Sequence, residues 1–286
     1  MQVDSIEQGR GNPCRAVAIA IAPNGGRRTK ADHPGLPTSA AELADCAESC
    51  LAAQASMIHV HVRDAEGRHC LDADRYREAS AAIRSRAGDR LIVQVTTESL
   101  GTYSPTEQIA LVRELRPEAA SIALREIVPD AAHEAAFANL LYWMRRERIF
   151  PQIILYDRAD MERLVEFHRR GLLAAEEIPL LFVLGRYTTD QQSQPADLIE
   201  FLANAPHGFT HWTVCAFGRQ EAACAVATAL MGGNVRVGFE NNLHLPNGDV
   251  AESNAELVLA VTEHLRVLGL PLSTADMQRE ALARIW

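Results

Sequence analysis

Two histidines separated by one residue, and a glutamate far along the chain, are the strongest candidates for chemistry in this sequence. His59 and His61 stand in the segment HVHVRD, and Arg236 and Glu240 begin and end the segment RVGFE. Side chains alternate between the two faces of a β-strand, so the histidines project the same way, as do Arg236 and Glu240. Two neutral imidazoles and a carboxylate are a ligand set for zinc with positions left open for a substrate. A His-x-His pair alone is a moderate signal, because polar strand residues can also be satisfied structurally.

The scaffold that must position these residues is predicted by the hydrophobic periodicity. Apolar, β-rich segments lie at 16–22, 57–62, 91–97, 119–124, 149–155, 180–184, 210–216 and 234–239. Helical patterns follow them at 40–54, 73–86, 105–115, 132–146, 160–169, 195–203, 220–231 and 251–268. Repeated strand–helix units of this number match a closed α/β barrel better than an open sheet, and no GxGxxG motif follows the first strand.

We therefore expect one TIM-barrel domain, a (β/α)8 barrel over residues 1–286, with a C-terminal helical extension at 273–286 that caps the barrel or bridges subunits. In such a barrel the second and eighth strands both neighbour the first, so His59, His61 and Glu240 can converge.

Further polar residues follow the predicted strands at the end where barrel enzymes build their sites. They are Thr96, Thr97 and Glu98, then Ser121, Arg125 and Glu126, then Tyr156 and Asp157. Each alone is more often a helix cap or a loop ion pair. Arg186 and Arg219 each follow a glycine after the sixth and seventh strands, where barrels often bind phosphates, so we expect them to suit a large anionic cosubstrate.

Charge and composition exclude several classes of partner. The formal net charge of −9 argues against a general nucleic-acid surface, and we expect no nucleic-acid partner. No uninterrupted apolar run is long enough to span a bilayer, and the first residues are polar, so we expect a cytoplasmic protein with no membrane partner. The six cysteines show no paired metal spacing and are expected to be reduced packing residues.

The sequence resembles the β-keto acid cleavage enzymes, whose founding activity is 3-keto-5-aminohexanoate cleavage. The matching segments, in order, are TKADHP at 29–34, HVHVRD at 59–64, QVTT at 94–97, RPE at 116–118, VLG at 183–185, GNVRVGFE at 233–240 and AESN at 251–254. The resemblance implies a zinc-dependent barrel that exchanges acyl groups between a β-keto acid and acetyl-CoA, giving acetoacetate and an acyl-CoA. It implies no organic cofactor, and it suggests a homotetramer.

Carried over position by position, the resemblance implies roles for particular residues. It places the zinc ligands on His59, His61 and Glu240, and the arginine that supports the catalytic acid–base on Arg236. It places the hydroxyl groups that hold the substrate on Thr96 and Ser121, and we add Thr97 as their neighbour. Arg186 and Arg219 are then the expected CoA-binding residues.

Two positions depart from the family pattern. Family members usually have an aspartate base after the zinc-binding glutamate, whereas this chain has Asn241, which can contact a substrate but cannot accept a proton at neutral pH. Glu98 and Glu126 are our candidates for the base. Arg27 aligns with a glutamate that reads the substrate ammonium, with an uncertainty of one residue that also admits Arg28. We therefore expect an anionic or neutral β-keto acid rather than the amino substrate.

Other functions remain open at this point. A class II metal-dependent aldolase or lyase would use the same Lewis acid without CoA. A metal hydrolase of the amidohydrolase type also uses a His-x-His pair, but it needs further histidines after the fifth and sixth strands, which end instead in LYD and LG. Asn241 also admits a catalytically idle protein that binds zinc and a keto acid.

Overall fold

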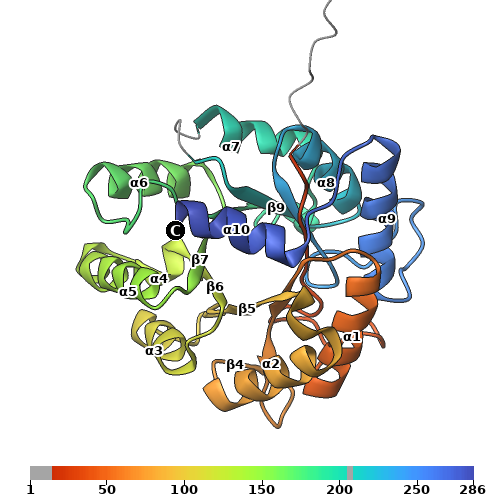
Figure 1. The fold of residues 1–286 in the computed structure, drawn as a ribbon, viewed down its shortest axis with the longest axis horizontal. Coiled ribbons are helices and arrows are strands. Elements are labelled where there is room, and N and C mark those ends of the chain that lie inside the picture. The colour runs from red at the N-terminus through yellow and green to blue at the C-terminus, as the bar shows by residue number, and fades with distance from the viewer. Residues whose placement is uncertain (1–14, 205–208) are drawn as a thin grey trace, which may run out of the picture.

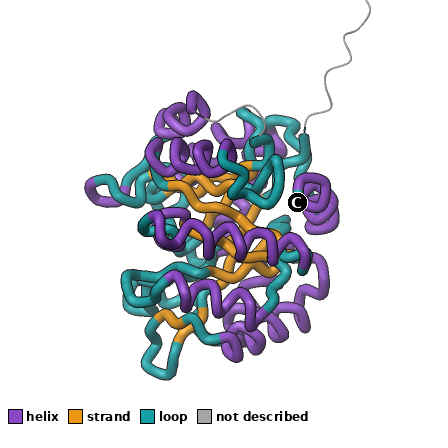
Figure 2. Tube along the Cα trace, turned by 90° about the vertical axis from the view of Figure 1, so that its left-hand side faces the viewer, coloured by secondary structure: helices purple, strands orange, loops and turns teal. Residues whose placement is uncertain are grey.

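The computed structural model describes residues 15–204 and 209–286, and at its centre is a closed barrel of parallel strands (Figures 1 and 2). Going around the barrel, the strands are β1 (Ile19–Ile21), β2 (Met57–Val60), β5 (Ile92–Thr96), β6 (Ala119–Ala123), β7 (Phe150–Leu155), β8 (Leu180–Leu184), β9 (Trp212–Ala216) and β10 (Asn234–Val237). Pairing of β10 with β1 closes the barrel. The predicted TIM barrel is confirmed.

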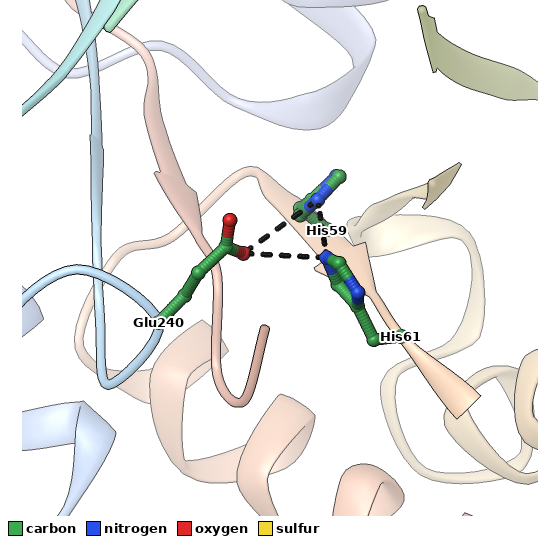
Figure 3. Close-up of side chains that lie close together, drawn as sticks. All are labelled: His59, His61 and Glu240. Atoms are coloured by element: carbon green, nitrogen blue, oxygen red, sulfur yellow. Dashed lines mark hydrogen bonds and ion pairs between the residues drawn. The ribbon is translucent and has the colours of Figure 1, made fainter. Parts of the chain in front are cut away.

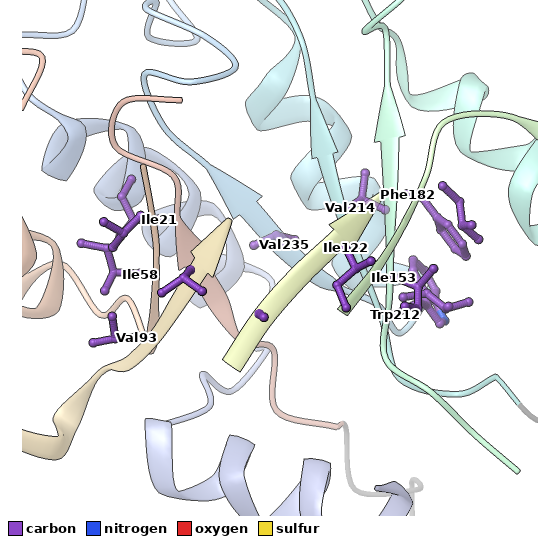
Figure 4. Packing of buried hydrophobic residues seen from close by; sticks show 14 of the residues in the cluster. Ile21, Ile58, Val93, Ile122, Ile153, Phe182, Trp212, Val214 and Val235 are labelled. Atoms are coloured by element: carbon purple, nitrogen blue, oxygen red, sulfur yellow. The ribbon is translucent and has the colours of Figure 1, made fainter. Parts of the chain in front are cut away.

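Helices surround the barrel. They are α1 (Ala40–Ala52), α2 (Ala73–Ala87), α3 (Pro105–Leu115), α4 (Leu124–Ile127), α5 (Glu134–Arg146), α6 (Arg158–Arg169), α7 (Leu198–Asn204), α8 (Glu221–Leu230), α9 (Asn254–Val267) and α10 (Ala275–Ile285). Ser39, Asp72, Ser104 and Asp157 begin four of them, each accepting a hydrogen bond from a backbone N–H of the first turn. Alternate residues of the strands, among them Ile58, Val93, Ile122 and Phe182, pack outward against the helices (Figure 4).

The C-terminal helix α10 closes one end of the barrel. Figure 1 shows α10 in front of the strands, and Figure 2 shows it at the right, with loops gathered at the left. Ala275 and Leu282 pack against Ala20, Met57 and Ile92 at the amino ends of the strands. The 273–286 extension therefore covers the amino ends of the strands, whereas connecting loops lie at their carboxyl ends.

Some strands are shorter than predicted. The segment 57–62 divides: β2 ends at Val60, and β3 (Val62–Arg63) pairs antiparallel with β4 (His69–Cys70) in a hairpin that was not predicted. The division follows from Asn24, whose side chain accepts from the N–H of His61 and donates to its carbonyl, so His61 leaves the strand ladder. The last strand ends at Val237, two residues before the predicted end.

Five of the six cysteines lie in the part of the chain that the structure describes. Cys46, Cys50, Cys70, Cys215 and Cys224 are free, and Cys14 lies outside the described residues. In the described ranges, no helix combines the length and the hydropathy that crossing a bilayer requires.

Candidate metal centre and active site

The three predicted ligands meet at the open end of the barrel (Figure 3). The Nε2 atoms of His59 and His61 lie 3.1 Å apart, and Oε2 of Glu240 lies 3.6 Å from the first and 3.5 Å from the second. Two atoms bound to one zinc ion at about 2.0–2.1 Å and at a tetrahedral angle are roughly 3.4 Å apart. The donor triangle therefore has the size of one face of a tetrahedral site. Within the described part of the chain, no other group of acidic, histidine and cysteine side chains has this spacing.

The protonation states of these groups also suit a cation. Burial lowers the pKa of His59 to about 4, with a further contribution from Arg236, and burial holds the pKa of His61 well below its usual range. Burial would raise the pKa of Glu240, but Arg236 and the two histidines outweigh it and hold that pKa well below the ordinary value. At neutral pH the site thus offers two neutral imidazoles and one carboxylate, the forms that bind a divalent metal. Oε2 of Glu240 is buried and has no hydrogen-bond partner.

The loop after β10 brings Glu240 to the histidines because several buried groups hold it. The N–H of Glu240 donates to Ala22, at the end of β1, over 3.1 Å. At Gly238, with φ of 136°, an added Cβ would lie 2.4 Å from the Ala22 oxygen, so only glycine fits. Asn254 accepts from the N–H of Phe239 and donates to the carbonyl of Pro23. Asn254 therefore joins the segment that carries Glu240 to the segment that follows β1.

A buried carboxyl group holds the same loop from α8. Glu221 accepts from the N–H of Gly238 over 3.0 Å and from the side chain of Asn242 over 3.2 Å. Burial raises the pKa of Glu221 to about 8. Neither Glu221 nor Asn24 was predicted as a site residue, and no spacing pattern in the sequence marks them.

Arg236 lies beside the donor triangle with part of its guanidinium unpaired. Its Nη2 donates to Oε1 of Glu240 over 3.1 Å and contacts Sγ of Cys215 over 3.3 Å. Its Nε and Nη1 are buried and have no partner. Burial opposes its charge, but Cys215 and Glu240 outweigh burial and raise the pKa of Arg236 above the ordinary value. These two nitrogens of the charged guanidinium are therefore free to donate hydrogen bonds to an anionic oxygen.

Two adjoining cavities open from this centre, sharing Glu98, Arg186, Phe217 and Glu240. The inner cavity has the metal donors, Thr96 and Arg236 on one side, and an apolar wall on the other formed by Ala123, Ile154, Val183 and Phe217. Tyr156 also lines it, and burial raises the pKa of its hydroxyl, which therefore stays protonated. The outer cavity carries Arg27 and Arg28 from the loop after β1.

Glu98 is the second carboxylate in these cavities. Its Oε2 lies 3.8 Å from Nδ1 of His61, and its Oε1 lies 4.0 Å from Nη2 of Arg186. Burial raises its pKa to about 7, with contributions from Glu240 and Glu126. Glu126, the other predicted base, accepts from the N–H of Ser99 and from Gln108 instead, and it does not line either cavity.

The remaining predicted residues lie at different distances from the centre. Thr96 lines the inner cavity, and its hydroxyl accepts from the N–H of Glu98. Thr97 donates its hydroxyl to the carbonyl of Ser121, and the Ser121 hydroxyl is buried without a partner. Asn241 is fully buried, and neither polar atom of its side chain has a partner. Arg219 is exposed and donates to the carbonyl of Gly248 over 3.4 Å.

Comparison with known proteins decides the family. A sequence model described as beta-keto acid cleavage enzyme matches residues 16–283. This chain belongs to the beta-keto acid cleavage enzyme family. It is 31% identical over 274 residues to the 3-keto-5-aminohexanoate cleavage enzyme of Fusobacterium nucleatum, covering 93% of this chain and 97% of that protein.

One further relative and one solved structure indicate the range of similarity. The 3-oxoadipate:acetyl-CoA acetyltransferase of Cupriavidus necator is 27% identical over 281 residues, with 94% of each chain covered. Among solved structures, a ternary complex of ObcA with a C4-CoA adduct and oxalate matches with a TM-score of 0.69 at 17% identity, covering 87% of this chain and 68% of that one. At that identity the match shows the shared fold.

Proposed function

We propose that this protein is a zinc-dependent enzyme that takes a β-keto acid and acetyl-CoA and gives acetoacetate and an acyl-CoA. The observation that carries the proposal is the donor triangle of His59, His61 and Glu240 beside an arginine with two unpaired, buried donor atoms. Membership of the family and relatives named for acetyl-CoA transfer support the reaction class.

The chain's own residues supply most of the proposed mechanism. A bound zinc ion would polarise the keto carbonyl and stabilise negative charge that develops on its oxygen. Arg236 would direct Nε and Nη1 at the substrate carboxylate or at that developing charge. Thr96 lies in the same cavity and would hold the substrate through its hydroxyl.

We assign the proton transfer to Glu98, on the carbon between the keto and carboxylate groups. Among the described residues that line the two cavities, Glu98 and Glu240 are the carboxylates, and Glu240 belongs to the metal site. Asn241 cannot accept the proton, because an amide is not a base at neutral pH.

We propose an anionic or neutral tail for the β-keto acid. Arg27 and Arg28 both line the outer cavity, and Arg186 stands between the two cavities. An ammonium group would be repelled there, whereas a carboxylate would be attracted. For CoA we propose contacts with Arg219 and Arg186. Arg219 is the more exposed, so it suits the bulky nucleotide, whereas Arg186 is 12% exposed and faces the reacting groups.

The test is an assay with acetyl-CoA and a panel of β-keto acids that includes 3-oxoadipate and 3-keto-5-aminohexanoate. We expect a higher kcat/KM for the dicarboxylic acid, and we expect Arg27→Glu to lower the ratio of the two values by at least about tenfold. Arg266→Glu, which makes the same charge change at an exposed position on α9, should leave the ratio unchanged. Efficient turnover of the amino substrate by the unaltered protein would contradict the proposed tail.

The buried, unpartnered side chain of Asn241 favours a second candidate, a protein that binds zinc and a keto acid without turning the acid over. Tight binding of keto acids with no acyl-CoA formed across the panel would support that candidate. Formation of product without acetyl-CoA would instead favour a metal-dependent aldolase or lyase.

A further inference from the structure

Part of the barrel interior below the metal donors is filled by polar side chains, which is unusual for this fold. Inward-facing positions of such barrels are mostly filled by bulky, branched apolar side chains. Here Gln94 of β5, Gln152 of β7 and Thr213 of β9 face inward and are 1%, 7% and 5% exposed. Burying an amide without partners is unfavourable, so these side chains need hydrogen bonds inside the barrel.

These side chains form a continuous chain of hydrogen bonds that starts at a metal donor. Nδ1 of His59 lies 2.8 Å from Oε1 of Gln94. Nε2 of Gln94 donates to Oε1 of Gln152 over 3.1 Å, and Nε2 of Gln152 donates to Oγ1 of Thr213 over 3.2 Å. We call Gln94, Gln152 and Thr213 the glutamine relay. It crosses the barrel from β2 to β9.

The relay has a direction. The amide oxygen of Gln94 can only accept, so Nδ1 of His59 carries the proton and Nε2 presents a lone pair to Glu240. Each amide then accepts through oxygen and donates through nitrogen in the same sense. Reversing the amide of Gln152 alone would place its nitrogen against the nitrogen of Gln94. The orientation of the Gln152 amide therefore constrains the orientation of the Gln94 amide.

We propose that Gln94, Gln152 and Thr213 are positioning residues that hold His59 in the tautomer able to bind the metal. The part of this inference that concerns metal affinity rests on the proposed function. Gln94 touches the ligand directly, whereas Gln152 and Thr213 act through it. Such outer partners of a ligating histidine typically change metal affinity by about 10–100-fold when removed.

A purely structural role for these residues would give a different result at Gln152. If the relay only filled the barrel, replacing Gln152 would lower stability without changing how His59 is protonated or how tightly the metal binds. Thr262→Val is the matched control, because its hydroxyl is buried in α9 and donates to the carbonyl of Ala53 outside the barrel. It loses one buried hydrogen bond and leaves the relay intact.

The experiment uses the full-length, metal-free protein with 15N-labelled histidine. NMR of the imidazole nitrogens reports the tautomer of His59, and competition with a chelator reports the affinity for zinc. We expect the unaltered protein and Thr262→Val to show one Nδ1–H form and equal affinity. We expect Gln94→Leu to mix the tautomers and to weaken zinc binding about 10–100-fold. Gln152→Leu should mix them partly and weaken binding at least about threefold.

Thr213→Val keeps the branched shape of the side chain and decides the matter if Gln152→Leu does not fold. We expect the same direction of change, because Val cannot accept from Gln152. A single Nδ1–H form and affinity within about twofold of the unaltered protein, in a folded Gln152→Leu or Thr213→Val, would overturn the relay. If the unaltered protein bound no zinc, the proposed function would be wrong. The tautomer of His59 in the variants would still test the proposed role of the relay.

Discussion

The side chains of the centre combine two neutral bases, one ionised carboxylate and one fixed cation in a buried space. Burial keeps His59 and His61 neutral, and Arg236 keeps Glu240 ionised. These states arise from neighbouring residues alone and match the states that metal binding requires. The centre is thus prepared for a cation by its surroundings.

Removing one imidazole should abolish both metal binding and turnover. For His59→Ala or His61→Ala we expect less than about a tenth of the zinc content of the unaltered protein, because two donors hold a zinc ion far more weakly than three. Metal analysis of the purified variants, together with the acetyl-CoA assay, checks this. A fully active, metal-free variant would refute the assignment of these ligands.

Replacing Glu98 should separate proton transfer from metal binding. Glu98→Gln keeps the size of the side chain but removes the base, so kcat should fall about 10²–10⁴-fold while the zinc content stays the same. Steady-state kinetics of Glu98→Gln and Glu126→Gln compare the two predicted bases. A larger loss of kcat in Glu126→Gln would show that our assignment is wrong.

The loops after β1 and β10 determine whether these side chains meet. Asn24 fixes the backbone of His61, Asn254 joins the ends of β1 and β10, and Glu221 holds Gly238 and Asn242. All three are buried polar groups that make at least two hydrogen bonds to loop atoms. The geometry of the metal donors therefore depends on residues that do not touch the metal.

Glu221 should make stability depend on pH. Its pKa is about 8 in the folded protein and about 4.5 in the unfolded chain, so as pH rises from 5 to 8 the unfolded chain ionises first and the free energy of unfolding falls by about 3–4 kcal/mol. Glu221→Gln cannot ionise and should not show this loss. Denaturant unfolding of both metal-free proteins at several pH values gives the difference.

The buried histidines have the opposite effect on the pH dependence. Their pKa values are lowered in the folded protein, so the unfolded chain binds protons first and the free energy of unfolding falls as pH falls. They are the same in both proteins, so their contribution cancels in the comparison. Unfolding free energies that remained parallel from pH 5 to 8 would contradict a buried, protonated Glu221.

How far these elements could be predicted from the sequence depends on the range of the interactions. Alternation along a strand is local, so the shared face of His59 and His61 was predictable, as was the presence of each barrel strand. The hairpin of β3 and β4 was missed because Asn24 ends β2, and Asn24 is 37 positions away along the chain. Glu221 was missed for the same reason, since its partners Gly238 and Asn242 are distant in sequence.

At the scale of the whole molecule, one end of the barrel carries the candidate site and the other end contributes to stability. The end at the carboxyl ends of the strands carries the metal donors and both cavities, and the other end is closed by α10. The sequence predicted the helix at 273–286 but left open whether it caps the barrel or bridges subunits, because an apolar helix face does not identify its partner. The homotetramer suggested by the resemblance stays a prediction, which light scattering of the purified protein would check.

Removing a packing contact between α10 and the barrel should lower stability without loss of zinc from the metal site. Leu282 is 3% exposed and packs under the barrel, so Leu282→Ala should lower the free energy of unfolding by about 2–4 kcal/mol. Zinc content should stay at the level of the unaltered protein. Denaturant unfolding and metal analysis check both, and loss of zinc from the folded variant would show that the two ends are not separate.

The central claim is that two nitrogens and one oxygen bind a common ion, and anomalous diffraction from crystals grown with zinc tests it most directly. We predict one strong anomalous peak about 2.0–2.2 Å from Nε2 of His59, Nε2 of His61 and Oε2 of Glu240. Full occupancy of zinc elsewhere, with these three atoms not bound to it, would contradict the account.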